Sequence, residues 1–279
     1  FRRKKKDNEI INEQKREVEH QKHLVEEKNT EILDSIQYAK RLQTAILPSK
    51  KLIKEWLPNS FILYKPKDIV AGDFYWMESV NGIIYFAAAD CTGHGVPGAM
   101  VSVVCSNALT KSLMEEGKTI PSELLDRTRE LVIERFVKSE EEIRDGMDIS
   151  LCAWDPSTKK LQWAGANNPL WIIRNGSEEI EEIRADKQPI GKYGAEKPFT
   201  NHEIKLAEGD TFYMFSDGFP DQFGGERGKK YKSGNLKRYF LSIQNLTLAD
   251  QRDALNNEFE NWRGDIEQID DVCIIGLRV

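Results

Sequence analysis

The protein has 279 residues, of which 39% are hydrophobic and 31% are charged, and its formal net charge at pH 7 is -6. The apolar content supports a packed core, and the length fits one large domain with an appendage or two modest domains. The negative charge argues against a general nucleic-acid-binding protein, because neutralising phosphates needs a surplus of lysine and arginine over a whole face. We therefore expect no nucleic-acid partner.

The cysteines and the apolar runs indicate the cellular setting. The four cysteines form no Cys-x-x-Cys pair and lie mostly in apolar runs, which is typical of reduced thiols in a cytosolic protein and argues against a zinc site. No run approaches the length of about 18 apolar residues that a membrane helix needs. There is also no signal-peptide pattern. These features predict a cytoplasmic location.

The chain begins with a basic cluster at residues 1–6 and without an initiating methionine. Such a cluster often lies on the cytoplasmic side of a membrane helix. Two interpretations stay open. The chain is the cytoplasmic part of a membrane-anchored protein with an upstream sensor or membrane module, or the cluster is a solvated chain end.

Residues 8–47 contain neither proline nor glycine, which predicts one long helix that Pro48 ends. Apolar residues recur at every seventh position and form a coiled-coil seam: Ile11, Val18, Val25, Ile32, Ala39 and Ile46. The companion seam position is mostly polar, so we expect a signal-carrying helix or a homodimer of marginal stability. For the last two turns, packing against the chain's own domain is the alternative. We place a helical coiled-coil linker at residues 1–47 and a globular domain at 48–279.

The first strands of the globular domain form a hairpin. A short amphipathic segment at 52–57 leads to a strand at 60–65. Two further runs of strand composition, 73–80 and 83–90, flank an Asn-Gly dipeptide. This dipeptide is the strongest short-range signal for a two-residue hairpin turn.

The hairpin turn fixes a register, and the register brings two acids together. With Asn81 and Gly82 as the loop, Val80 pairs with Ile83, and counting outward places Asp73 opposite Asp90. Like charges directly opposite each other destabilise a sheet and raise each other's pKa. The pair therefore indicates a shared proton or a bound cation, and a hard divalent metal suits its oxygen ligands.

Asp90 also ends its strand at a glycine-rich corner, residues 87–98, before a helix that Pro97 opens and that runs to residue 110. A strand, a charged corner and a helix together place a ligand or metal site. A plain turn is the alternative.

The remaining elements are mostly antiparallel strands with few helices between them. In chain order we predict a helix at 121–138, strands at 148–154 and 161–164, a hairpin of 170–174 and 179–183 around Asn175-Gly176, strands at 202–206 and 211–216, helices at 235–242 and 248–263, and a strand at 272–277.

Two more acidic centres stand at strand ends. One is Asp217 before Gly218, and the other is Asp270 beside Asp271. Four buried carboxylates would be too costly without a compensating charge. Asp73, Asp90, Asp217 and Asp270 together therefore predict one or two divalent cations. Two Mg²⁺ or Mn²⁺ ions could bridge a water, lower its pKa and stabilise an in-line phosphoryl displacement.

A local basic segment, residues 225–238, is the exception in this acidic chain. We predict a mobile substrate-binding flap at residues 227–238, with Lys229, Lys230 and Lys232 contacting a phosphoprotein. A solvated loop is the alternative.

Four ordered motifs resemble a known family. They are Gly72-Asp73-Phe74-Tyr75-Trp76, Ala89-Asp90-Cys91-Thr92-Gly93-His94-Gly95, Ser216-Asp217-Gly218 and Asp270-Asp271-Val272. These motifs are similar to those of the metal-dependent protein phosphatases (PPM), in the bacterial SpoIIE-type branch related to the type 2C phosphatases. The likeness runs from about residue 60 to residue 279. The preceding helix is similar to linkers that join such domains to sensor or membrane modules.

The resemblance implies a fold, a ligand set and a reaction. The fold is α+β, a four-layer α-β-β-α sandwich of two antiparallel sheets flanked by helices. The ligands of two Mn²⁺ or Mg²⁺ ions are Asp73, Asp90, Asp217, Asp270 and the backbone carbonyl of Cys91. The reaction is hydrolysis of phosphoserine or phosphothreonine on a protein by a metal-activated water. The usual substrate is a phosphorylated regulatory protein, such as an anti-sigma-factor antagonist.

Two departures from the family pattern bear on roles. Many relatives have Ala-Gly-His-Asn-Pro where this chain has Gly165-Ala166-Asn167-Asn168-Pro169, so a histidine is missing from that loop. Type 2C enzymes have a histidine two residues after the aspartate that corresponds to Asp90, and here that residue is Thr92. His94 stands two residues further on, and both loop stabilisation and catalysis stay open for it.

Two alternatives to an active phosphoprotein phosphatase are kept. The first is a non-catalytic signalling module that binds a partner on the same fold, although all four expected carboxylates are present. The second is a metal phosphohydrolase for small molecules or nucleotides, against which the absence of a Walker-type glycine loop counts.

Overall fold

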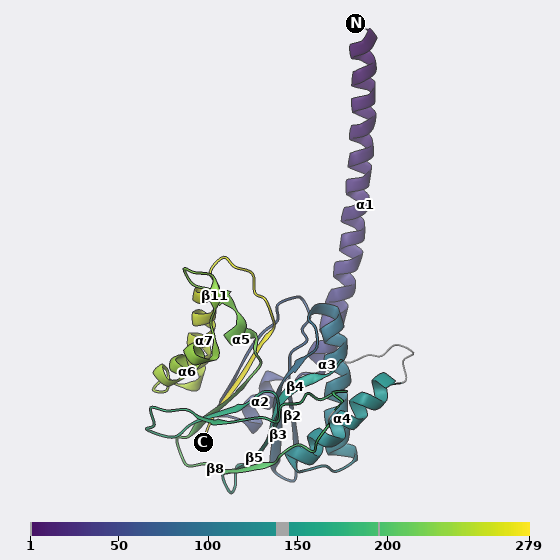
Figure 1. The fold of residues 1–279 in the computed structure, drawn as a ribbon. Coiled ribbons are helices and arrows are strands. Elements are labelled where there is room, and N and C mark those ends of the chain that lie inside the picture. Colours follow the sequence, from purple (N-terminus) through teal and green to yellow (C-terminus); the bar gives the residue numbers. More distant parts are fainter. Residues whose placement is uncertain (1, 138–144, 195) are drawn as a thin grey trace. The chain divides into compact units, whose positions relative to one another are not determined.

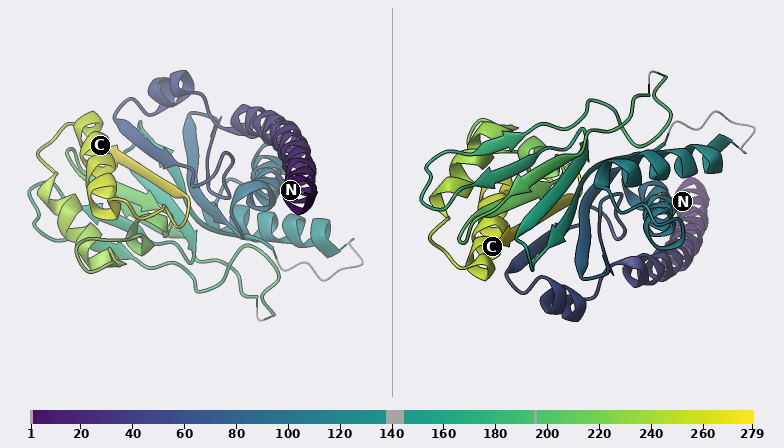
Figure 2. Two further views of the ribbon diagram at one scale, coloured as in Figure 1. Left: turned by 90° about the horizontal axis from the view of Figure 1, so that it is seen from above. Right: turned by 90° about the horizontal axis from the view of Figure 1, so that it is seen from below.

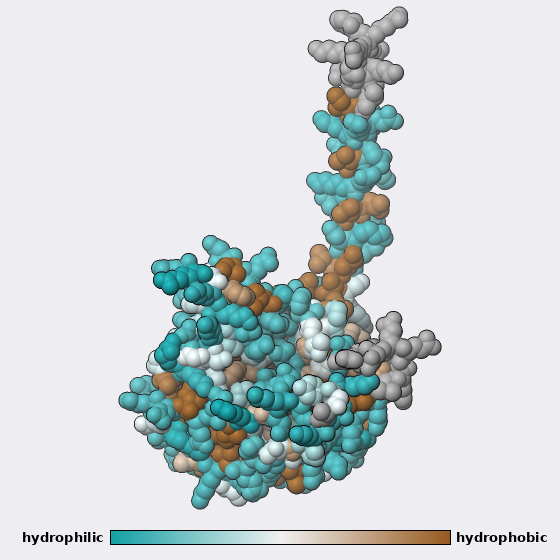
Figure 3. Space-filling model, in the orientation of Figure 1, coloured by the Kyte–Doolittle hydropathy of each residue, from teal (hydrophilic) through white to brown (hydrophobic). Residues whose placement is uncertain are grey.

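The computed structural model describes residues 2–137, 145–194 and 196–279, and the chain divides into two units, residues 1–42 and 43–279. The first unit is formed by helix α1 (Arg2–Ile46), whose last turn belongs to the second unit (Figure 1). The predicted seam residues Ile11, Val18, Val25 and Ile32 are all more than half exposed. Apolar patches recur along this helix in Figure 3. No helix in the described ranges is both long and apolar enough to cross a membrane.

The second unit contains two five-stranded sheets in which all neighbouring strands are antiparallel. The first sheet has the order β1 (Ser60–Lys65), β12 (Val272–Arg278), β9 (Thr211–Phe215), β6 (Leu170–Ile173) and β7 (Glu181–Ile183). The second has the order β2 (Phe74–Val80), β3 (Ile83–Cys91), β4 (Met147–Asp155), β5 (Lys160–Ala166) and β8 (His202–Lys205).

Helices and a small hairpin complete this unit. They are α2 (Lys50–Trp56), α3 (Gly95–Thr110) with a π-helical extension η1 (Lys111–Glu115), α4 (Pro121–Val137), α5 (Gly218–Asp221), α6 (Ser233–Ser242), α7 (Leu248–Arg263), and the strands β10 (Phe223–Gly224) and β11 (Lys229–Lys230).

Alternating side chains build three apolar layers, because successive residues of a strand point to opposite faces of the sheet. One face of β3 packs under α3 and α4, where Ala87 and Ala89 join Cys105 and Leu109. The other faces of the two sheets meet each other, and the outer face of the first sheet packs on α6 and α7. Figure 2 shows the sheets face to face between the two pairs of helices. The expected four-layer α-β-β-α sandwich is confirmed.

Most predicted elements occur with shifts of a few residues. The strand at 60–65 and the helix at 248–263 have the predicted bounds. Strand β7, the return strand of the hairpin around Asn175-Gly176, begins at Glu181 instead of the predicted residue 179. The sequence patterns did not indicate η1, α5 or the β10–β11 hairpin, and residue 138 of the predicted helix lies outside the described residues.

The second unit starts at the end of α1, where the buried Gln43 binds the loop before β2. Its Nε2 donates to the carbonyl of Ala71 at 2.6 Å and to Ser102 Oγ at 3.0 Å. Its Oε1 accepts from the Ala71 N–H at 3.1 Å. This side chain therefore satisfies both main-chain groups of Ala71, two residues before Asp73.

Candidate metal centre

The β2–β3 hairpin has the predicted register. Asn81 and Gly82 both have positive φ angles, 53° and 81°, as a two-residue turn of type I′ requires. Val80 pairs with Ile83, and the ladder continues outward to Phe74 and Ala89. The next position outward is the one that Asp73 and Asp90 occupy, and Asp90 raises the pKa of Asp73.

Strand alternation turns these acids toward the space between the sheets. Ala88 and Met77 belong to the apolar layer between the two sheets. Asp90 is two residues after Ala88, and Asp73 is four residues before Met77, so both lie on that inner face. Asp148 pairs with Asp90 across the β3–β4 ladder and is four residues from the inner-facing Cys152. The acids of this sheet thus gather at one end of the sandwich.

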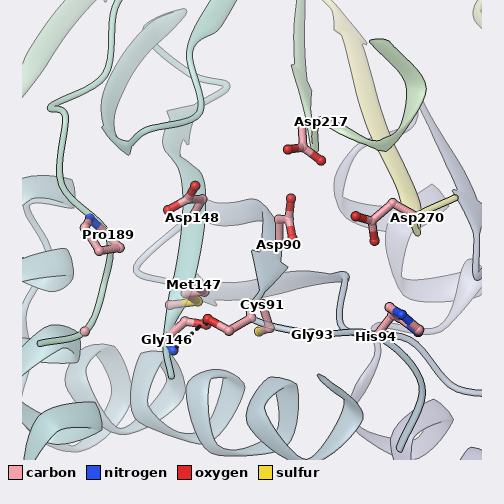
Figure 4. A pocket seen from close by; sticks show the side chains of 12 residues that line it. Asp90, Cys91, Gly93, His94, Gly146, Met147, Asp148, Pro189, Asp217 and Asp270 are labelled. Atoms are coloured by element: carbon pink, nitrogen blue, oxygen red, sulfur yellow. Dashed lines mark hydrogen bonds between the residues drawn. The ribbon is translucent and has the colours of Figure 1, made fainter. Parts of the chain in front are cut away.

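The first sheet brings its acids to the same end. β9 and β12 are antiparallel neighbours, with Phe215 opposite Ile274. The end of β9 therefore lies beside the start of β12, and Asp217 and Asp270 follow and precede these strands. A pocket of about 300 Å³ is lined by Asp90, Cys91, Asp148, Asp217 and Asp270 among others. In Figure 4 the carboxylates of Asp90, Asp148, Asp217 and Asp270 extend toward a common space.

Asp73 is the most deeply buried of the predicted ligands, with 2% of its surface exposed. Ser216 Oγ donates a hydrogen bond to its Oδ2 and accepts one from the Cys273 N–H at 2.9 Å. The Tyr64 hydroxyl donates to the Asp73 carbonyl at 2.9 Å. Burial, and then the nearby charge of Asp90, raise the pKa of Asp73 well above its usual range.

The pKa values of Asp90 and Asp217 are also raised. For Asp90 the causes are burial and then the charges of Asp217 and Asp270. For Asp217 they are burial and then the charges of Asp221 and Asp270. Each of these carboxyl groups therefore resists ionisation unless a positive charge is nearby.

The donor set fits hard divalent cations. None of the described residues lining the pocket is lysine or arginine, so no side chain there offsets the acids. Within the described ranges, no three His, Cys, Asp or Glu side chains already surround one point closely enough to ligate an ion. Carboxylate and carbonyl oxygens are the ligands that Mg²⁺ prefers, and such an ion would offset the clustered charge. The residues present therefore fit the cations that this fold family uses.

The loop before β2 approaches the corner after β3 so closely that only glycine fits. A Cβ on Gly72 would lie 2.3 Å from the carbonyl oxygen of Gly93 and 3.1 Å from that of Cys91. Both contacts are to backbone and cannot move aside cheaply. This close approach holds Asp73 against the strand end that carries Asp90 and the Cys91 carbonyl.

Asp271 has a different position from its neighbour Asp270. Its buried carboxylate accepts hydrogen bonds from the Lys67 and Gly72 N–H groups, both at 2.7 Å. Asp270 instead lines the pocket. Asp271 therefore anchors the loop that carries Asp73.

Asp148 and Asn167 are site residues that the sequence analysis did not identify. Asn167 Nδ2 donates to Asp148 Oδ1 at 2.8 Å, and Asp148 lines the pocket. Burial raises the pKa of Asp148. The only available signals were the position of Asp148 at a strand start and the departure from the family pattern at Asn167.

His94 lies at the rim of the pocket. Its Nδ1 is 2.9 Å from Asp68 Oδ2, and both side chains are about half exposed. This pairing links the corner after β3 to the loop before β2, as expected of a loop-stabilising residue.

The three predicted substrate-binding lysines lie on or beside the β10–β11 hairpin and are exposed. Lys230 Nζ is 2.7 Å from Asp221 Oδ2. The N–H of Gly225 donates to the carbonyl of Trp262 at 2.7 Å, so the hairpin is bound to α7. None of these lysines is among the described residues that line the pocket.

Comparisons with known proteins agree with this geometry. A family model described as Stage II sporulation protein E (SpoIIE) matches residues 81–279. The SiaA-PP2C domain of Pseudomonas aeruginosa is 31% identical, with a TM-score of 0.81 and coverage of 90% of this chain and 98% of that chain. The PP2C phosphatase domain of Bacillus subtilis SpoIIE with a fragment of its regulatory domain is 19% identical, with a TM-score of 0.62 and coverages of 79% and 63%.

A third similar structure contains the RsbU and RsbW domains of a Mycobacterium tuberculosis protein, at 19% identity, a TM-score of 0.60 and coverages of 80% and 60%. Curated proteins give no match. The four-layer fold and its acidic centre define a phosphatase domain of the metal-dependent PP2C type. The family model matches more than half of this chain, which shows that the chain belongs to the SpoIIE family.

Replacing Ser216 with alanine tests how Asp73 is held. The change removes the donor to Asp73 and leaves the Cys273 N–H without its acceptor, so we expect Mn²⁺ affinity to fall by about 10-fold. Titration calorimetry measures this. Ser112→Ala is the matched control, because Ser112 is equally buried but donates to the Ala108 carbonyl at 2.8 Å in another layer. Equal Mn²⁺ affinities for the two variants would contradict the assignment.

Proposed function

We propose that the protein is a Mn²⁺- or Mg²⁺-dependent phosphatase that hydrolyses phosphoserine or phosphothreonine on a regulatory protein. The observation that carries the proposal is the gathering of Asp90, Asp217 and Asp270 in one pocket, with Asp73 at the ladder position next to Asp90. Two separate sheets supply these acids. Such an arrangement suits a cation pair and a phosphate ester better than it suits a structural turn.

Each residue has a definite part in this proposal. Asp73, Asp90, Asp217, Asp270 and the Cys91 carbonyl would hold the cations. When bound, the cations would lower the pKa of a water and polarise the phosphate ester. Ser216 holds the Asp73 carboxylate in place through its hydroxyl donor.

The proposed substrate class is a phosphorylated partner protein such as an anti-sigma-factor antagonist. Membership of the SpoIIE family supports this class. The pocket is lined from both sheets and from the corner after β3, and its Asp217 is exposed, which suits a phosphorylated residue on a protein surface. Two cations of Mn²⁺ or Mg²⁺ are the proposed cofactors.

Replacing Asp90 or Asp217 with asparagine should abolish hydrolysis. Each change removes a ligand charge, so we expect Mn²⁺-dependent phosphate release from p-nitrophenyl phosphate and from a phosphopeptide to fall more than about 100-fold. Asp253→Asn is the control, because Asp253 is an exposed aspartate on α7 that pairs with Arg252. Phosphate release with chromogenic detection is the measurement.

Three outcomes separate the proposal from its alternatives. Unchanged release in both variants, with contamination excluded, would contradict the proposal. No metal uptake at millimolar Mn²⁺ would favour a non-catalytic partner-binding module. A clear preference for nucleotides over phosphopeptides would favour a small-molecule phosphohydrolase.

Neutralising Lys229, Lys230 and Lys232 to glutamine should affect large substrates selectively. These exposed cations lie beyond Asp217 and could contact an acidic protein surface, so we expect KM for a phosphoprotein to rise about 3- to 10-fold. KM for p-nitrophenyl phosphate should stay unchanged. The control replaces Lys50, Lys51 and Lys54 of α2, and equal effects on both substrates would count against docking.

We also propose that residues 1–47 form a regulatory coiled-coil linker that supports a homodimer. Ile11, Val18, Val25 and Ile32 expose an apolar stripe of heptad spacing. Changing Val18 and Val25 to glutamate should convert the dimer to a monomer in size-exclusion chromatography with light scattering. Arg16→Glu with His23→Glu alters the opposite face and should leave the dimer intact. A monomeric unaltered protein would contradict the proposal.

A further inference from the structure

A second cavity of about 300 Å³ lies beside the metal centre and shares Asp217 with it. Its other walls come from the loop after β5, from β6 and β7, and from α5 and α6. Pro169, Trp171, Phe215 and Pro220 contribute apolar surface. The proposed roles of the acids do not use this space.

Two hydrogen-bond donors among the residues that line this cavity have no partner in the described part of the chain. They are Asn168 Nδ2 and Trp171 Nε1, on side chains that are 8% and 2% exposed. An indole N–H and an amide NH₂ can only donate. Both donor atoms have less than 1 Å² exposed, and buried donors are almost always paired in native proteins, so these two lack an acceptor that a ligand or a water would supply.

The two donors are held by rigid surroundings. The Trp171 ring lies 4.3 Å from the Phe215 ring and 6.0 Å from that of Phe240, measured between centroids. Lys237 Nζ is 4.9 Å from the centroid of the same indole ring. Asn168 follows Asn167, whose positive φ of 58° turns the chain sharply. Asn167 contacts Asp148 at the metal centre, so two consecutive side chains serve the two cavities.

The charges at the cavity favour a neutral acceptor. Lys237 is the cation among its described lining residues, and it already forms an ion pair with Glu182. Asp217 adds a second negative charge. A carboxylate ligand would therefore face two acids and one neutralised lysine, whereas a peptide carbonyl oxygen carries no net charge.

We propose that this cavity binds the main chain of the protein substrate next to its phosphorylated residue. Asn168 Nδ2 and Trp171 Nε1 donate to peptide carbonyl oxygens of that segment. Continuity with the metal centre through Asp217 identifies the occupant, because a chain whose phosphate lies at the acids must pass an adjoining space. The inference rests on the proposed function and explains how a protein substrate is preferred over a small phosphate ester.

The experiment compares a peptide with a small ester. The peptide is capped Ala-Ala-phosphoserine-Ala-Ala, and the ester is p-nitrophenyl phosphate. Trp171→Phe retains an aromatic ring and removes the N–H, and Asn168→Leu replaces the amide with a hydrocarbon of similar shape. Each variant should raise KM for the peptide about 2- to 10-fold and leave kcat/KM for the ester unchanged. Trp154→Phe is the control, because Trp154 is a buried tryptophan of β4 that lies outside this cavity.

A binding measurement makes the test independent of turnover. The indole N–H resonance of Trp171 is identified by its loss in Trp171→Phe, and the protein is titrated in Mg²⁺ with the phosphonate analogue of the peptide. We expect this resonance to shift with the peptide and not with p-nitrophenyl phosphonate. A shift without hydrolysis of any phosphate ester would retain the subsite and reject the proposed function.

Two results would overturn the subsite. The first is an indole resonance that stays fixed while the peptide analogue saturates the metal centre, since water then suffices as the acceptor. The second is an equal change of KM for peptide and ester in both variants. If Trp171→Phe fails to fold, the KM values of Asn168→Leu for peptide and ester decide.

Discussion

The mutual repulsion of carboxylates at one end of the sandwich is the constraint on which the rest of the structure depends. Asp73 and Asp90 lie on the inner face of one sheet, and Asp217 and Asp270 adjoin the ends of β9 and β12, two neighbouring interior strands of the other. A sheet would ordinarily separate such charges. Here the apolar layers behind them, built from residues such as Ala87, hold the strands in register. The folding energy of three cores thus maintains an arrangement that is unfavourable until cations bind.

Contacts to the main chain of the loop before β2 carry this constraint to the loops. Gly72 lies so close to the Gly93 carbonyl that no side chain fits between them. Asp271 accepts from the N–H groups of Lys67 and Gly72, and Gln43 satisfies both main-chain groups of Ala71. The segment that carries Asp73 is therefore fixed at Lys67, Ala71 and Gly72. A buried carboxylate on a backbone held in this way is pre-organised for a ligand.

The resemblance of the four motifs to a known family predicted the fold class. The approach of Asp73 to Asp90 could be predicted from the residues themselves, because a two-residue Asn-Gly turn leaves only one register to count. Asp148 could not be found in this way. Helices α3 and α4 separate β4 from β3, and no short turn fixes the pairing of Asp148 with Asp90. The β10–β11 hairpin was not predicted for a related reason. Its two-residue strands are too short to show a periodicity, and the hairpin depends on tertiary hydrogen bonding to α7.

The loop after β5 shows why its departure from the family pattern matters physically. With Asn167 in a left-handed conformation, consecutive side chains point to different sides of the loop. One amide donates to Asp148 beside the metal centre, and the other leaves its donor unpaired at the neighbouring cavity. The positive φ of Asn167 sets the positions of both side chains. Chemistry at the acids and recognition of the polypeptide beside them therefore share one short piece of backbone.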